Sequence, residues 1–365
     1  MLAIVIVCAL LTYGGVSLFV VVFAVYPFAA EAFRIGGLPK RLIPGTIALG
    51  AFTFTMDALP GTPQIQNIIP AAFFGTNTWS APWLGLIGAC YIVAGGLTYL
   101  TWRLRQAATA GEGYGTGHIQ EPEPIDDRDL PNPLVALLPL VVVGVMNLVF
   151  TRALPALYGD TYTVSLAGLD HPLTGPVPPN VAIWAVQLAL VSGILMVFAT
   201  AFPAVTRRFA DGSKAAVAGA LLASINTATE YGFGSVIAAL PGFIAIRDAL
   251  TAIPNPLINE AISVTTLAGI TGSASGGLSI ALAAMSGQFI AAANAAHIPL
   301  GVLHRVAAMA SGGMDTLPHN GAVITLLAVT GLTHRQSYKD IFALTLIKTS
   351  AVFVVIAVYY LTGIV

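Results

Sequence analysis

Apolar runs of about 20 residues recur along the whole chain, and this feature restricts the fold more than any other. A run of this length crosses a bilayer as a helix, whereas barrel strands would alternate polar and apolar residues. Only 8% of the residues are charged and 56% are hydrophobic, whereas soluble domains carry roughly 25% charged residues. The sequence therefore predicts an all-α integral membrane protein, built as a polytopic helical bundle.

Gly, Pro and polar residues interrupt several of these runs, so some are too long or too broken to be single helices. The predicted hydrophobic segments are residues 1–29, 42–72, 83–101, 132–150, 181–205, 215–249, 261–296, 304–331 and 341–364.

Lys and Arg gather in four loops, which the positive-inside rule assigns to the cytoplasm. These loops contain Arg34, Lys40 and Arg41; Arg103 and Arg105; Arg207, Arg208 and Lys214; and Arg335 and Lys339. The orientation alternates correctly if residues 215–249 form a re-entrant hairpin with the polar, Gly-rich stretch INTATEYGFG at its tip. The alternative is a plain span, which would place Arg247 outside and make residues 250–296 cross twice.

An internal repeat is visible in two matched motifs. The stretch YGGVSLFVVV at 13–22 resembles SGGLSIALAA at 275–284, and FTMDALPGT at 54–62 resembles SGGMDTLPHN at 311–320. The two pairs keep their order at nearly constant separation. The loop assignment gives the two halves opposite orientations, and inverted repeats with broken helices are typical of secondary transporters.

The repeat defines three predicted units: a first repeat at 1–105, a cytoplasmic linker at 106–131 and a second repeat at 132–365. The second repeat has two spans and a hairpin before Gly276, whereas only thirteen residues precede Gly14. We therefore expect the first repeat to lack its N-terminal spans. The linker is rich in Gly and charged residues, which favours a flexible connector.

The Met-Asp-x-Leu-Pro motifs supply the strongest candidate residues. Pro60 and Gly61 in the first repeat, and Pro318 in the second, are predicted helix breaks. An acid at this depth costs roughly 2.5–3.5 kcal/mol on insertion scales, so Asp315 and its counterpart Asp57 are predicted to serve proton coupling. Glu230 in the predicted hairpin and His319 beside Pro318 are further proton-coupling candidates. The alternative for each is local hydrogen bonding.

Uncharged polar groups and glycines near the breaks are the predicted substrate-binding residues. Amide and hydroxyl groups suit a polyhydroxy substrate, although helix–helix hydrogen bonding and close packing are the alternatives. These candidates are Gly14, Gly15, Ser17, Thr62, Gln64, Gln66, Asn67, Ser224, Asn226, Thr227, Gly276, Gly277, Ser279 and Asn320.

The sequence contains no nucleophile elbow, His-Glu-x-x-His motif, Walker loop or paired-cysteine metal site. It therefore predicts no enzyme, no cofactor and no metal, with an ion gradient as the source of energy. The net charge of −1 does not suggest nucleic acid as a partner. The expected partners are a small organic anion, protons and the lipid bilayer, with a homo-oligomer left open.

Four long stretches resemble the gluconate permease (GntP-type) family of bacterial inner-membrane symporters, part of the ion-transporter superfamily. They are VCALLTYGGVSLFVVVFAVYP at 7–27, PKRLIPGTIALGAFTFTMDALPGTPQIQNIIP at 39–70, INTATEYGFGS at 225–235 and ASGGMDTLPHNGAVITLLAVTGLTH at 310–334. The resemblance implies proton-coupled uptake of gluconate or a related small acid across the inner membrane. It also implies that SINT at 224–227 is a hairpin tip at the substrate site.

Two departures from this family bear on the interpretation. Its members usually have further membrane segments before the position of Met1, and its pattern does not require an acid at Asp57. Permeases for 3-hydroxybutyrate or D-serine-like substrates, and a passive channel or facilitator, remain the alternatives.

Overall fold

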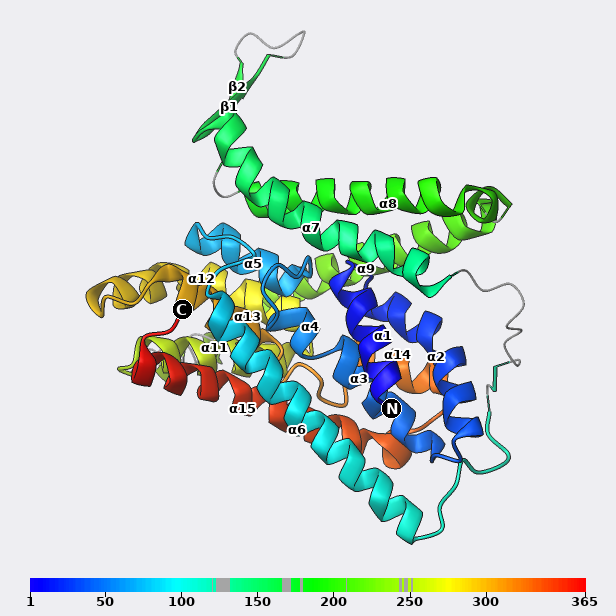
Figure 1. Ribbon diagram of the computed structural model, residues 1–365. Coiled ribbons are helices and arrows are strands. Elements are labelled where there is room, and N and C mark those ends of the chain that lie inside the picture. The colour runs from blue at the N-terminus through cyan, green and yellow to red at the C-terminus, as the bar shows by residue number, and fades with distance from the viewer. Residues whose placement is uncertain are drawn as a thin grey trace.

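The computed structural model describes residues 1–119, 121–122, 132–165, 172–177, 180–207, 209–242, 245, 249–250 and 252–365. For residues 133, 182, 215, 219, 222–223, 226–227, 230–231, 233–235 and 237–238, it describes the backbone alone. Within these residues the chain is helical apart from one small hairpin of strands, which confirms the predicted all-α class (Figure 1).

The first hydrophobic stretches fold into helices that are interrupted at Gly and Pro. The elements are α1 (Leu2–Tyr13), α2 (Leu18–Ile35), the 3-10 turn η1 (Lys40–Leu42), α3 (Ile43–Ala51), the single turn α4 (Phe54–Asp57), α5 (Ile65–Phe74) and α6 (Pro82–Thr109). Gly15 and Gly61 adopt positive φ angles of 88° and 75°, which glycine tolerates without steric strain. Pro60 and Gly61, the predicted helix breaks, both lie in the irregular stretch between α4 and α5.

Two long helices and a β-hairpin form a separate layer along one side of the body (Figure 1). These elements are α7 (Pro133–Tyr158), β1 (Thr161–Val164), β2 (Leu173–Pro176) and α8 (Val181–Arg207). The strands are antiparallel, with Thr161 opposite Pro176 and Val164 opposite Leu173. The helices α7 and α8 pack mainly on each other and leave most of their apolar side chains exposed, as a surface facing lipid would.

The predicted re-entrant hairpin at 215–249 is wrong in its tip. Residues 225–234 lie inside α9, a single helix over Phe209–Ala238, and this helix ends just before Pro241. The stretch contains glycines but no proline before Pro241, and glycine is common inside membrane helices. A polar composition alone therefore did not break this helix.

The last third of the chain repeats the element order of the first. It contains α11 (Pro256–Thr271), α12 (Ala274–Ala295), α13 (Leu300–Ser311), α14 (Gly321–Thr330), the π-turn η4 (His334–Tyr338) and α15 (Lys339–Thr362). The helices α1, α2, α3, α5 and α6 thus have α11, α12, α13, α14 and α15 as counterparts. Pro318 lies in the irregular stretch between α13 and α14, as predicted.

The structure corrects the register of the glycine pairs. Gly14 ends α1 and Gly272 ends α11, and their separation of 258 residues is the one that separates Asp57 from Asp315. Gly276 and Gly277 instead lie in the first turn of α12. The residue that corresponds to Ser17 is therefore Ser275 and not Ser279.

The two repeats pack across each other. The helix α5 contacts α12 and α13, the helix α14 contacts α2 and α3, and α6 runs against α15. Each repeat thus covers the broken segments of the other, and the breaks meet inside the body. Among the described residues, six helices have the length and hydropathy needed to cross a membrane: Leu18–Ile35, Pro82–Thr109, Leu134–Tyr158, Ile183–Arg207, Ala274–Ala295 and His334–Thr362.

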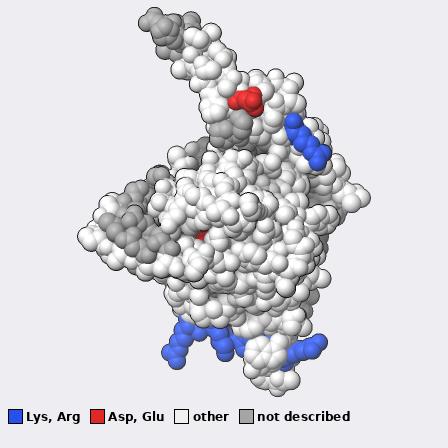
Figure 2. Space-filling model, turned by 90° about the vertical axis from the view of Figure 1, so that its left-hand side faces the viewer, with Lys and Arg blue, Asp and Glu red and all other residues white. Residues whose placement is uncertain are grey.

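Three of the four predicted cytoplasmic loops meet at one end of the body. Asp340 at the start of α15 accepts hydrogen bonds from Arg103 at 2.6 Å and from Tyr99 at 2.9 Å, and Arg41 lies 3.5 Å from it. Figure 2 shows Lys and Arg at this lower end and few charged residues over the middle of the body. The fourth loop lies at the junction of α8 and α9, away from the other three (Figure 1).

The described part of the predicted linker is attached to this end. Lys40 donates hydrogen bonds to the backbone oxygen of Ile119 at 3.1 Å and to Glu121 at 2.6 Å, and Arg41 contacts Glu112 at 2.7 Å. Helix α6 also extends past the predicted boundary at residue 105, to Thr109. Residues 106–122 are therefore anchored where they are described, and residues 123–131 lie outside the described part.

Candidate functional site

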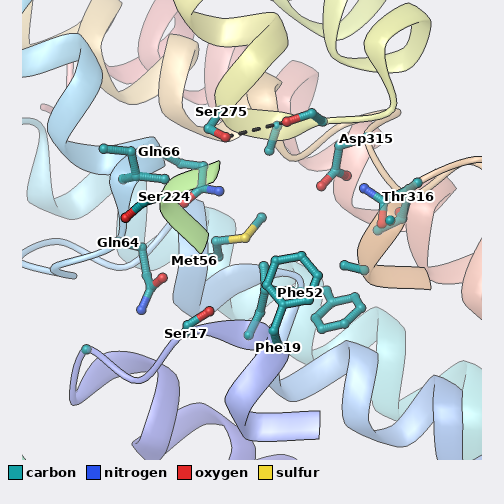
Figure 3. A pocket seen from close by; sticks show the side chains of 18 of the residues that line it. Ser17, Phe19, Phe52, Met56, Gln64, Gln66, Ser224, Ser275, Asp315 and Thr316 are labelled. Carbon is teal, nitrogen blue, oxygen red and sulfur yellow. Dashed lines mark hydrogen bonds between the residues drawn. The ribbon is translucent and has the colours of Figure 1, made fainter. Parts of the chain in front are cut away.

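A cavity of about 820 Å³ lies where the broken segments of the two repeats meet. Its wall comes from the break between α1 and α2, the break between α4 and α5, the junction of α11 and α12, the break between α13 and α14, and one face of α9. Seven of the predicted substrate or proton-coupling residues line it: Gly15, Ser17, Gln64, Gln66, Ser224, Asp315 and Asn320. Figure 3 shows Gln64 and Gln66 on one side of this space and Asp315 on the other.

Four helices begin at the wall of this cavity. The residues preceding their first turns are Ser17 for α2, Gln64 for α5, Ser273 for α12 and Asn320 for α14, and all four line the cavity. A helix N-terminus carries about half a positive charge and unpaired backbone N–H groups, so it attracts anions. Four such ends contribute positive potential to a space whose described lining residues include one charged side chain, that of Asp315.

The four ends differ in their caps. The Ser273 hydroxyl accepts a hydrogen bond from the amide of Gly276 at 3.1 Å, and the Asn320 side chain accepts one from Val323 at 2.8 Å. Ser17 and Gln64 form no such side-chain cap. In the second repeat a side chain thus accepts from one amide at each of these helix starts, whereas the first-turn amides of α2 and α5 receive no such side-chain acceptor and suit a ligand better.

Two glutamines shape the first-repeat wall in different ways. The Gln64 amide donates to the backbone oxygens of Thr12 at 2.7 Å and Val16 at 3.4 Å, which ties the start of α5 to the break between α1 and α2. The Gln66 side chain is only 5% exposed, and its carbonyl oxygen has no hydrogen-bond partner among the described residues. Because a buried unpaired amide oxygen is unfavourable, Gln66 is the group here that is best prepared to bind a ligand.

Asp315 forms a buried ion pair at the opposite wall. Its carboxylate accepts a hydrogen bond from the Lys348 ammonium at 2.5 Å, and the same ammonium donates to the backbone oxygen of Phe52 at 3.0 Å. Lys348 lies on α15 and is 2% exposed. One side chain of the second repeat thus holds the break of its own repeat and the break of the first.

Lys348 is not among the predicted site residues, although its place in the sequence indicates a buried partner. It interrupts the apolar segment 341–364, where a cation costs roughly 2.5–3.5 kcal/mol on insertion scales and so indicates a partner.

Asp57 is buried beside this ion pair but does not line the cavity. Neither of its carboxylate oxygens has a hydrogen-bond partner among the described residues, and its side chain packs against Gly312 of the second repeat. Lys348, Asp315 and Arg305 are close enough to interact with it electrostatically. The structure thus brings the two predicted aspartates into one cluster of charged groups.

Asn67 and Thr62 hold the protein together and do not face the cavity. The Asn67 side chain donates to the backbone oxygens of Thr62 and Thr78, both at 2.9 Å, and its own oxygen contacts His304 and Arg305. The Thr62 hydroxyl donates to the backbone oxygen of Thr55 at 2.7 Å. Their prediction as substrate-binding residues is therefore corrected, because all of these polar groups are used internally.

A buried arginine organises the loop before α6. Arg305 on α13 is fully buried and donates to the backbone oxygens of Ser80 at 2.7 Å, Asp57 at 3.3 Å and Thr78 at 3.4 Å. The neighbouring His304 contacts the hydroxyl of Thr76 at 2.7 Å. Both residues lie inside the predicted segment 304–331, where two adjacent polar residues in an apolar run indicate buried hydrogen-bond partners.

Several other predicted residues lie away from the cavity. Added side-chain atoms at Gly14 and Gly277 would overlap Leu140 and Ala268, so close packing explains these two glycines. Gly276, Ser279 and His319 are not part of the cavity wall, and His319 is exposed. The side chains of Asn226, Thr227 and Glu230 lie outside the described part. Ser224 reaches the cavity from the side of α9 and not from a hairpin tip.

Metal ligands are not grouped in the part of the chain that the structure describes. No cluster of three or more His, Cys, Asp or Glu side chains is placed there to hold a metal ion. The cavity therefore offers helix ends, amides, hydroxyls and one ion pair, which are groups that bind an organic anion through hydrogen bonds.

Comparison with known proteins gives the family of this chain. The chain is 56% identical to the uncharacterized transporter YxjC of Bacillus subtilis (strain 168) over an alignment of 373 positions, which covers 100% of this chain and 79% of YxjC. No family model matches the chain. No solved structure matches it either. Its full-length similarity to YxjC shows that the chain belongs to the YxjC family of transporters, and six helices of the described part are long and apolar enough to cross a membrane, as in a multi-pass membrane protein.

Proposed function

We propose that this protein is a proton-coupled symporter that carries gluconate or a similar small hydroxy or sugar acid across the bacterial inner membrane. The observation that carries this proposal is the meeting of four helix N-termini, two from each repeat, at one cavity of about 820 Å³. Such ends bind anions, and the volume lies within the range of small-molecule sites.

The carboxylate of the substrate binds at the uncapped starts of α2 and α5. The amide of Gln66 and the hydroxyls of Ser17 and Ser275 then bind the hydroxyl groups of the substrate. These three side chains line the cavity, and the oxygen of Gln66 lacks a partner of its own. A substrate hydroxyl that donates to this oxygen removes the penalty of leaving it unpaired.

Transport follows the alternating-access principle. The two repeats have opposite orientations in the membrane, and a rocking motion of one against the other opens the shared cavity to one side at a time. The matched order of α1–α6 and α11–α15 and the packing of each repeat over the breaks of the other support this mechanism.

Proton coupling is assigned to Asp315 and Asp57, which lie in one cluster with Lys348. When one proton is carried with one carboxylate, their electrical terms cancel, so the pH gradient drives uptake, and each pH unit is worth about 1.4 kcal/mol. The resemblance to the gluconate permease family supports this assignment. No enzymatic step is proposed.

Transport assays with the purified full chain in liposomes test this function. Radiolabelled gluconate, 3-hydroxybutyrate and D-serine are offered with and without an inward proton gradient. We expect one of the two hydroxy acids to accumulate, and a protonophore to abolish accumulation. An Asp315→Asn variant should lose accumulation. Accumulation of D-serine alone would indicate an amino-acid permease, and gradient-independent equilibration of all three would indicate a passive facilitator.

A further inference from the structure

Two buried carboxyl groups share one buried ammonium group at the junction of the repeats. Asp315, Asp57 and Lys348 are 4%, 1% and 2% exposed. In the arrangement that the structure describes, Lys348 is bound to Asp315, and the Asp57 carboxyl has no hydrogen-bond partner. Only Asp315 of the two acids lines the cavity.

The cations around Asp57 are not equally free to move towards it. Arg305 on α13 is held by hydrogen bonds to the backbone oxygens of Ser80 and Thr78 in the loop before α6, and to that of Asp57 itself. Lys348 on α15 has three donors, and the structure shows hydrogen bonds from its ammonium to two acceptors, Asp315 and the Phe52 oxygen. Lys348 can therefore change partners with the loss of fewer hydrogen bonds to backbone oxygens than Arg305.

The missing hydrogen bond to the Asp57 carboxyl sets the condition for such an exchange. With both carboxyls ionised, Lys348 and Arg305 balance the two negative charges, but none of the Arg305 hydrogen bonds in the structure reaches the Asp57 carboxyl. A buried carboxylate that accepts no hydrogen bond is strongly unfavourable. One proton on this carboxyl removes the penalty. The unpartnered carboxyl of Asp57 is the place that accommodates this proton without disturbing the ion pair between Lys348 and Asp315.

We propose that Asp57 carries the exchangeable proton and that Lys348 transmits its presence to the cavity through Asp315. While Asp57 is protonated, Lys348 neutralises Asp315 and the cavity accepts a carboxylate. When the proton leaves, the ionised Asp57 attracts Lys348, and Asp315 then exposes an unbalanced negative charge that repels the carboxylate. Proton binding thus precedes substrate binding. This inference rests on the proposed symport and assigns its coupling step.

The sign of the cavity charge can be measured without any substrate. In the full chain with both native cysteines, Cys8 and Cys90, replaced by alanine, Ser17→Cys places one thiol at the cavity wall. The thiol is reacted with a negatively and with a positively charged methanethiosulfonate reagent at a series of pH values. The ratio of the two rates reports the local charge, because the ionisation of the thiol affects both rates equally.

We expect the ratio of the anionic to the cationic rate to fall about tenfold as the pH rises, because one added charge acts at short range in a poorly screened site. In the Asp57→Asn background, which mimics the protonated acid, the ratio should stay at its low-pH value. Glu260→Gln is the matched control, since Glu260 on α11 is also fully buried with unpartnered carboxylate oxygens. In the Glu260→Gln protein the ratio of the two rates should fall with pH as it does in the protein with native Glu260.

Three outcomes would overturn the inference. They are a ratio that does not change with pH in the Ser17→Cys protein, an equal fall in the Asp57→Asn background, and a fall that disappears in Glu260→Gln. The exposed His319 beside the cavity-lining Asn320 is present in every variant, so a difference between the Asp57→Asn background and the other proteins does not come from His319. The outcome does not depend on which substrate is carried, so a failure of the transport assay and a failure of this inference are distinguishable.

Discussion

The ammonium of Lys348 lies 2.5 Å from the Asp315 carboxylate and 3.0 Å from the backbone oxygen of Phe52. A single side chain of α15 therefore fixes the broken segments of both repeats next to the cavity. Because it is buried and charged, its removal leaves Asp315 without compensation.

We expect Lys348→Met to destabilise the folded protein by about 3–5 kcal/mol, since breaking a buried ion pair leaves an unpaired charge. The double variant Lys348→Met, Asp315→Asn removes both charges and should recover most of this loss. Thermal unfolding of the purified variants in detergent measures the difference. Equal midpoints for the single and the double variant would show that the ion pair is not what stabilises this junction.

Arg305→Lys should lower stability although it keeps the charge. The guanidinium donates to Ser80 through two of its nitrogens, at 3.2 and 2.7 Å, and an ammonium cannot reproduce this arrangement together with the bonds to Thr78 and Asn67. We expect a loss of about 2–3 kcal/mol, as for hydrogen bonds of charged groups. The measurement is chemical unfolding followed by fluorescence of Trp79, which lies in the loop that Arg305 holds. Wild-type stability of Arg305→Lys would contradict this role.

Gly312→Ala should be strongly destabilising. A methyl group at Gly312 would overlap the Asp57 carboxylate, and both residues are buried where the two repeats meet. Gly287→Ala in α12 is the matched control, because nothing lies near the added methyl group there. The control should gain up to about 1 kcal/mol from the higher helix propensity of alanine. Comparable unfolding midpoints for the two variants would show that the repeats do not meet closely at Gly312.

The stability of the anchored linker should depend on pH at the acidic end. The hydrogen bond from Arg41 holds the pKa of Glu112 below its ordinary value. A lowered folded-state pKa contributes stability above the unfolded-state pKa, and this contribution is lost as the pH falls through the folded-state value. Because the pair is partly exposed, we expect an effect of at most about 1 kcal/mol.

Protease susceptibility of residues 106–131 as a function of pH measures this effect. Glu112→Gln should be cleaved at neutral pH as fast as the wild type is cleaved in acid. An unchanged acid sensitivity in Glu112→Gln would assign it to another group, such as Glu121, which binds Lys40.

The membrane spans and the two breaks could be predicted because their signals are local. Helix length follows from hydropathy, and Pro60 and Pro318 remove a backbone donor wherever they stand. The hairpin tip was mispredicted because polar and Gly-rich residues at 225–234 are compatible with a helix.

The partners across the repeats could not be predicted from one sequence. The distance between Lys348 and Phe52, or between Gly312 and Asp57, depends on how the two repeats pack, which no local pattern determines. The same holds for the contrast between two neighbouring amides. The side-chain oxygen of Gln66 has no partner among the described residues and lies at the cavity, whereas the Asn67 side chain donates to backbone oxygens of the loops. The sequence therefore identified the polar residues near the breaks but not which of them face the cavity.

The account depends on a small hydroxy acid whose carboxylate binds at the uncapped starts of α2 and α5 and whose hydroxyl group donates to Gln66. Its most direct test is the thermal stabilisation of the purified full chain by gluconate and by 3-hydroxybutyrate, with glucose as the uncharged probe. We predict that at least one of the two acids raises the unfolding midpoint, that glucose does not, and that Gln66→Leu removes most of the shift. Stabilisation by glucose equal to that by the acids, or a full shift in Gln66→Leu, would contradict the account.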